Sequence, residues 1–307
     1  MTELGVSAYL WVVFTVLAAA FQTARNATQK GLTARLGTLG ATYVRFLYGL
    51  PFAVLSLAAM LLVIDQPLPR PGLAFAGWLF AGAVCQIAAT ALMLAAMQLR
   101  SFVVATAYTK TEALQVALFA LVFLSERLSL LATLAIIAAT IGVWLLSWPK
   151  ATPAGGSTWK PAAFGLAAGA FFAVSAVGFK GAIVTLGIAP TPIGFVLPAT
   201  VTLVLGLLLQ TVLLAAWQSL RDARVLVEVA RAWRPSLLAG CMGATASQMW
   251  FLAFAIAPTA HVRSLGMIEV LFALAVSRRL FSQATTARDG AGIALVVLGS
   301  LLLINAR

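Results

Sequence analysis

Two stretches, YTKTEALQVALFALVFLSERL at residues 108–128 and LGMIEVLFALAVSRRLFSQA at residues 265–284, decide how the rest of the chain is interpreted. Each belongs to a longer apolar run with one carboxylate near the middle, Glu112 in the first and Glu269 in the second. The chain has only 8 acidic residues among 307, so two at matching places are informative. An ionisable side chain inside a membrane is costly, which makes it a functional hypothesis by default.

The composition predicts an integral membrane protein. The chain is 62% hydrophobic and 9% charged, with a mean hydropathy of +1.03, whereas about a quarter of the residues in a soluble domain are charged. Met1 to Val6 carries Glu3 and no Lys or Arg, which does not suit a signal peptide. The first apolar run is therefore expected to remain as a helix.

Apolar runs of about 20 residues, separated by Pro, Gly and charged residues, predict an all-α fold with ten transmembrane helices. The predicted spans are 8–33, 39–63, 72–97, 101–124, 129–147, 160–186, 190–217, 235–257, 259–281 and 289–305.

The two halves of the chain repeat each other. A shift of 150 residues aligns 18–37 with 168–187 without a gap, with seven of twenty positions identical. A shift of 157 residues pairs Glu112 with Glu269, and Gly142 with Gly299. A rival shift of 153 matches a leucine-rich string in each half, but it loses the glutamate pair and the glycine pair.

The repeat divides the chain into residues 1–148, a linker at 149–161, and residues 162–307. Because five helices per half is an odd number, the second half must enter the membrane from the opposite side. The sequence therefore predicts two inverted five-helix repeats, an arrangement that places a binding site near the midplane of secondary transporters.

The net charge of +12 comes without a basic cluster that has interleaved aromatics, so no nucleic-acid partner is expected. The positive-inside rule explains the excess, and thirteen basic residues against three favour termini outside the cytoplasm. Cys85 and Cys241 lie inside apolar runs without metal-ligand spacing, so no disulfide, metal site or cofactor is expected.

The chain resembles the ten-helix EamA-type branch of the drug/metabolite transporter superfamily over essentially its whole length. The residues that carry the resemblance are Ser125-Glu126-Arg127-Leu128 followed by Gly142, Val44-Arg45-Phe46-Leu47 and Thr111-Glu112. The resemblance implies secondary transport of small metabolites by alternating access, with helices of both halves lining a central cavity. Termini are often cytoplasmic in this family, which is the opposite of the orientation that the charge count favours.

Glu112 and Glu269 are the first candidates for a substrate or proton site. A carboxyl group in a low-dielectric cavity can exchange a proton or neutralise a cationic substrate. The alternative is a structural ion pair with Lys110, Arg263 or Arg25 as the partner. Within one continuous helix, Lys110 would not face Glu112, because residues two apart lie on different faces.

A second group of candidates lies on the first span, where Gln22, Arg25, Asn26 and Gln29 recur at helical spacing. They form one polar stripe if the span continues past them. Alternatively, the span ends near Ala24 and Arg25 meets lipid headgroups. The paired N–H donors of an Arg guanidinium match a carboxylate, and a Glu carboxylate matches an ammonium group. Arg and Glu in one cavity would therefore suit a zwitterion such as an amino acid.

The remaining site candidates are mid-span residues that can hydrogen-bond or stack with a solute or bridge helices: Tyr108, Gln86, Gln248 and Trp250. Arg45 and Arg263 are interpreted as snorkelling residues near helix ends.

The leading hypothesis is a proton-coupled secondary transporter in a bacterial inner membrane, as a monomer or homodimer, for an amino-acid-like or other zwitterionic or cationic solute. The expected partners are this solute, protons and membrane lipid. The alternative is a structural or partner-binding membrane subunit. A membrane enzyme is disfavoured, because no nucleophile stands beside a base and no catalytic residue is identified.

Overall fold

The computed structural model describes residues 3–99, 102–125, 128–147, 159–189, 191–281 and 287–305. These residues form an α-helical bundle that contains no strand within the described ranges. Most of the predicted linker lies outside the described residues, as do Arg100, Glu126 and Arg127. The all-α prediction is confirmed.

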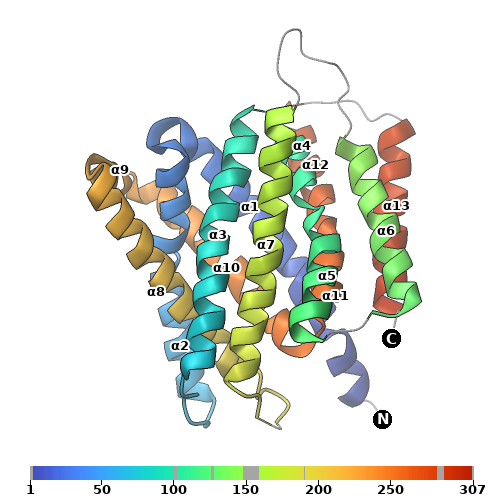
Figure 1. Cartoon of the computed structure of the whole chain (residues 1–307), viewed down its shortest axis with the longest axis horizontal. Coiled ribbons are helices and arrows are strands. Elements are labelled where there is room, and N and C mark those ends of the chain that lie inside the picture. The colour runs from blue at the N-terminus through green and yellow to red at the C-terminus, as the bar shows by residue number, and fades with distance from the viewer. Residues whose placement is uncertain are drawn as a thin grey trace.

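The helices follow the predicted spans closely (Figure 1). The first half contains α1 (Glu3–Leu47), α2 (Leu50–Val63), α3 (Leu73–Leu99), α4 (Phe102–Thr109), α5 (Glu112–Leu124) and α6 (Leu130–Ser147). The second half contains α7 (Trp159–Thr185), α8 (Val196–Arg221), α9 (Arg224–Arg231), α10 (Trp233–Ile256), α11 (Thr259–Leu265), the short 3₁₀ helix η1 (Gly266–Ile268), α12 (Glu269–Phe281) and α13 (Ala287–Asn305).

Helix lengths agree with ten crossings of a bilayer. Six described stretches are long and apolar enough to cross, and one of them, Tyr9–Val63, contains the first two predicted spans. Three shorter apolar helices, Glu112–Leu124, Leu130–Leu145 and Gly290–Asn305, lie at the predicted fourth, fifth and tenth spans. The fourth span is interrupted by a turn between α4 and α5, and the ninth span passes from α11 through the 3₁₀ helix η1 into α12.

Gly37 separates the first span from the second. Its backbone has φ 67° and ψ 176° inside the continuous α1 assignment, a conformation that is essentially restricted to glycine. Gly187, which follows α7, also has a positive φ of 77°, and these two are the positive-φ glycines of the described chain. The shift of 150 residues that aligns the two halves pairs Gly37 with Gly187, so the repeated sequence has a positive-φ glycine at the same place in both halves.

Replacing Gly37 with alanine is expected to lower the free energy of unfolding by about 1–3 kcal/mol, because alanine adopts this conformation only with strain. SDS titration in mixed micelles measures this change. Gly31→Ala is the matched control, since Gly31 is helical and has no other atom within 4 Å of an added Cβ. It is expected to gain up to about 1 kcal/mol. Equal stability of the two variants would contradict the assigned role of Gly37.

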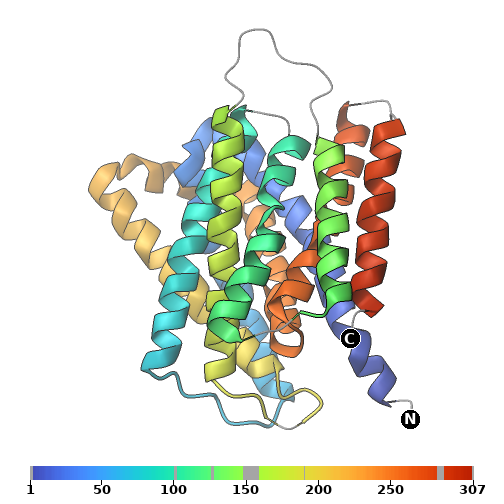
Figure 2. The same cartoon turned by 45° about the vertical axis from the view of Figure 1, so that its right-hand side comes forward.

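The two halves run through the bundle in opposite directions. The N-terminal end of α1 and the C-terminal end of α13 lie at one end, whereas α6 finishes and α7 begins at the other (Figures 1 and 2). The most extensive helix interfaces join the halves, α3 with α7, α1 with α10 and α6 with α13. Opposite directions are what an inverted repeat requires, and the repeat itself stays a prediction.

The pair formed by α6 and α13 stands at one side of the bundle (Figure 2). Its close contact depends on the two glycines that the sequence repeat pairs. A Cβ on Gly142 would lie 2.7 Å from the Gly292 carbonyl oxygen, and a Cβ on Gly299 would lie 2.6 Å from that of Ala135. Small residues at such contacts let membrane helices approach closely.

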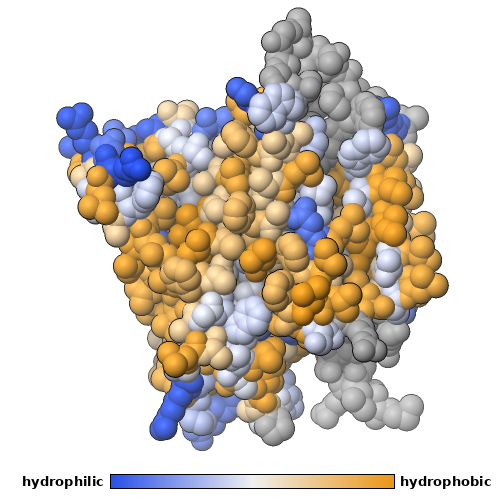
Figure 3. All heavy atoms as spheres, in the orientation of Figure 1, coloured by the Kyte–Doolittle hydropathy of each residue, from blue (hydrophilic) through white to orange (hydrophobic). Residues whose placement is uncertain are grey.

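The side of the bundle is apolar, and hydrophilic residues gather mainly at its two ends (Figure 3). Leu62 is 89% exposed and Leu118 58% exposed, as expected for side chains that face lipid. The short helix α9 lies at the end where α6 finishes (Figure 1) and carries Arg224 and Arg231. The positive-inside rule favours that end as the cytoplasmic one, which stays a prediction.

Candidate functional site

The two glutamates occupy equivalent positions in two broken helices. Glu112 is the first residue of α5, directly after the break at Lys110–Thr111, and Glu269 is the first residue of α12, directly after η1. Their side chains are 2% and 1% exposed, so both carboxylates are buried inside the bundle. A carboxylate at a helix N-terminus is stabilised by the helix dipole, which lowers the cost of burying both charged side chains.

Cationic side chains bring the two glutamates into one network. Arg263 Nη2 lies 2.7 Å from Glu112 Oε1, and Lys110 Nζ lies 3.7 Å from the same oxygen. Lys110 also pairs with Glu269. The prediction that Lys110 would not face Glu112 is wrong, because Lys110 and Thr111 form a turn between α4 and α5, where the angular spacing of a regular α-helix does not apply.

The polar stripe of the first span lies inside the bundle and reaches Glu269. Gln22 Nε2 donates to Glu269 Oε2 at 2.6 Å, and Asn26 Nδ2 donates to Glu269 Oε1 at 2.9 Å. Arg25 is fully buried and donates to Asn26 Oδ1 through Nε and Nη2. The alternative in which the span ends near Ala24 is therefore wrong, because the helix continues to the turn at Gly37.

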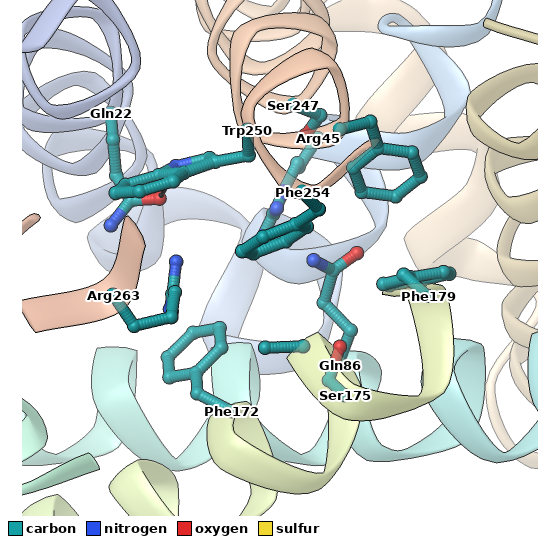
Figure 4. Close-up of a pocket in the computed structure, with 12 residues that line it drawn as sticks. Gln22, Arg45, Gln86, Phe172, Ser175, Phe179, Ser247, Trp250, Phe254 and Arg263 are labelled. Atoms are coloured by element: carbon teal, nitrogen blue, oxygen red, sulfur yellow. Dashed lines mark hydrogen bonds between the residues drawn. The ribbon is translucent and has the colours of Figure 1, made fainter. Parts of the chain in front are cut away.

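A small cavity of about 20 Å³ lies next to this network (Figure 4). That volume holds about one water molecule. Its lining residues come from both halves: Gln22, Arg45, Gln86, Phe172, Ser175, Ala176, Phe179, Ser247, Trp250, Phe251, Phe254 and Arg263. The site is thus contracted in this structure, and a solute of several heavy atoms requires it to widen.

The cavity contacts the glutamates through two of its lining residues. Gln22 binds Glu269 and accepts a hydrogen bond from Trp250 Nε1 at 2.9 Å. Arg263 binds Glu112, and its Cζ lies 4.6 Å from the centroid of the Trp250 ring. Each carboxylate is therefore one side chain away from the cavity.

The other predicted residues are divided between the cavity and its surroundings. Gln86 lines the cavity and accepts a hydrogen bond from Gln210 Nε2 at 2.8 Å. Gln248 points elsewhere and donates to Thr200 Oγ1 at 2.9 Å. Tyr108 lies before the break and packs on α7, where a Cβ on Gly165 would lie 2.3 Å from the Tyr108 Cβ.

Two cavity residues were assigned to the wrong environment from sequence. Arg45 and Arg263 are 3% and 6% exposed and line the cavity, so the snorkelling interpretation is wrong. Arg45 Nη1 donates to Thr90 Oγ1 at 2.8 Å. The sequence carried one signal, since Arg45 lies about two helical turns from the start of the predicted second span rather than at its terminal residue.

The apolar bundle and its long apolar helices define a multi-pass membrane protein. Residues 7–148 match the model of the EamA-like transporter family. The match agrees with the resemblance seen in the sequence over the first half of the chain, and it suggests a membrane transporter of small solutes.

Other comparisons concern the fold. A search of curated proteins finds no match. Among solved structures, a crystal structure of another protein matches with a TM-score of 0.68, at 15% sequence identity, over 98% of this chain and 97% of that chain. At this identity the match shows a shared fold and nothing about the solute.

Proposed function

We propose that this protein is a secondary transporter that moves a small organic solute across a bacterial inner membrane by alternating access, coupled to protons. The observation that supports the proposal is that two side chains connect the cavity with the buried carboxylates. Gln22 and Arg263 line the cavity and at the same time hold Glu269 and Glu112.

Alternating access requires parts of the site to move relative to each other, and the broken helices supply suitable joints. The turn before Glu112 and the 3₁₀ helix η1 before Glu269 interrupt the regular α-helix beside the buried network. Broken helices at membrane depth are tolerated where they line a protein-enclosed cavity, and they form the binding sites of many secondary transporters. The cavity is too small for a solute of several heavy atoms, so binding such a solute requires the site to widen.

Proton coupling follows from competition for hydrogen-bond donors. A solute that bonds to Arg263 or Gln22 withdraws a donor from Glu112 or Glu269. A buried carboxylate that loses its partner is costly as an ion and is relieved by taking up a proton. Solute occupancy and protonation are therefore linked through the same side chains.

The test is uptake by proteoliposomes under an imposed pH gradient. Vesicles with and without the protein are incubated with a library of amino acids, organic acids, vitamins and quaternary amines, and the lumen is then analysed by mass spectrometry. At least one solute is expected to accumulate only in the vesicles with protein, and to stop accumulating when the gradient is collapsed. Equal contents in both kinds of vesicle would contradict transport, and gradient-independent uptake would contradict proton coupling.

A further inference from the structure

We propose that the transported solute is an organic anion, held through a carboxylate or comparable group by Arg45 and Arg263, with a flat apolar or aromatic body against the rings of the cavity. The inference rests on the proposed function and replaces the zwitterionic or cationic solute that the sequence predicts with an anionic one. Three observations carry it: the charge balance of the buried side chains, unused donors on two of them, and the lining of the cavity.

The buried charges do not balance. Among the described residues, the charged side chains classed as buried are Arg25, Arg45, Lys110 and Arg263, against Glu112 and Glu269. The site therefore carries two more positive than negative charges when every group is ionised. A buried charge without a counter-charge is strongly unfavourable, so a bound anion would relieve this excess and a cation would increase it.

The unbalanced charges are on arginines with free donors. Arg263 pairs with Glu112 and Lys110 pairs with Glu269, so that within the described part of the chain Arg25 and Arg45 have no carboxylate as an ion-pair partner. Arg25 uses the Asn26 side-chain oxygen and Arg45 uses the Thr90 hydroxyl, both of which are neutral. Arg25 Nη1 and Arg45 Nε are buried without a hydrogen-bond partner.

Arg45 and Arg25 also lie close to each other. A Cβ on Gly243 would lie 3.2 Å from Arg25 Cδ and 3.4 Å from Arg45 Cγ, so both side chains pass the same glycine of α10. Of the two, Arg45 reaches the cavity, together with Arg263 from α11 (Figure 4). Two guanidinium groups at one cavity provide directed donors for a carboxylate.

The rest of the lining fits the body of such a solute. No Asp or Glu is among the cavity residues, so an ammonium group would meet guanidinium groups and no counter-charge. Aromatic rings dominate the wall: Phe172, Phe179, Trp250, Phe251 and Phe254. Flat apolar groups pack favourably on such rings, and a mainly apolar pocket with a few convergent polar groups is typical of small-molecule sites.

Binding to the purified full-length protein tests this inference without any transport step. The probes are phenylacetate, its neutral amide phenylacetamide, its cationic analogue phenethylamine, and acetate, which lacks the ring. Phenylacetate is expected to raise the melting temperature in detergent, and the other three at equal concentration to leave it nearly unchanged. Ligand stabilisation follows occupancy, so weak binding is detectable at high concentration.

Titration calorimetry of Arg45→Gln then identifies the residue. Its affinity for phenylacetate is expected to fall about 30-fold or more, since one partner of a buried charge pair is lost. Arg35→Gln is the matched control, because Arg35 lies on the same helix α1 and is exposed. It is expected to bind as the wild type does.

Several outcomes overturn the inference. Equal stabilisation by the carboxylate and the amide would show that charge is not recognised, and stronger stabilisation by the amine would show a cation site. Unchanged affinity in Arg45→Gln would remove Arg45 from the site. If that variant does not fold, the ranking of the four probes on the wild type decides alone. Carboxylate binding without uptake would refute the transport proposal only, and uptake of non-anionic solutes with no carboxylate binding would refute this inference only.

Discussion

The Arg45→Met protein is expected to be more stable than the wild type in the absence of solute and to have lost transport. Arg45 is a buried cation that donates a hydrogen bond to the neutral Thr90 hydroxyl. Replacing buried ionic side chains with apolar ones of similar size often stabilises a protein, by about 1–4 kcal/mol. Thr90 would remain satisfied, because its hydroxyl also donates to the Gln86 carbonyl oxygen at 2.8 Å.

SDS titration measures the free energy of unfolding and proteoliposome uptake measures transport, both on the same preparation. Arg35→Met is the control at an exposed position of α1, and its stability is expected to stay within about 0.5 kcal/mol of the wild type. A gain in stability together with a loss of function is typical of residues retained for activity. A large loss of stability in Arg45→Met would show instead that Arg45 supports the fold.

Glu269→Gln is expected to have the opposite effect on stability, a loss of about 3–5 kcal/mol, as for a buried ion pair from which one partner is removed. Glu269 accepts hydrogen bonds from Gln22 and Asn26 and pairs with Lys110. Its neutralisation raises the excess of positive charge in the site. Removal of the cationic partner in Lys110→Met lowers that excess, so the account predicts a smaller loss for this variant.

The comparison uses Glu228→Gln as its control, because Glu228 is exposed on α9 and the substitution is identical. Unfolding of the three variants in mixed micelles gives their order of stability. An equal or greater loss in Lys110→Met than in Glu269→Gln would show that the buried charges are balanced by some other group, and it would remove the charge argument for an anionic solute.

The helical framework could be predicted because it depends on features that a sequence displays directly. Span length follows from the apolar runs, and the repeat at a shift of 150 residues already paired Gly37 with Gly187. The break before Glu112 could not be predicted, since Lys110 and Thr111 are not helix-breaking residues. Tertiary contacts stabilise this break: Lys110 pairs across the bundle with Glu269.

The candidate site was partly predictable because polar residues inside apolar spans are visible in the sequence. Polar residues in the middle of apolar spans, such as Gln22 and Glu269, were singled out, and the structure places them in hydrogen-bond contact. Arg263 was missed because its distance from the predicted span end suggested a lipid headgroup, whereas the packing of α11 buries it beside Trp250. Depth in a bundle depends on neighbours that one sequence does not reveal.

Proton entry during solute uptake tests the central claim most directly, that cavity occupancy is coupled to the two buried glutamates. Vesicles loaded with the pH-sensitive dye pyranine receive a mixture of small organic acids, and passive entry is subtracted with protein-free vesicles. The account predicts acidification of the lumen by the wild type, and none above the passive level by the double variant Glu112→Gln, Glu269→Gln. Equal acidification by the wild type and the double variant would contradict it.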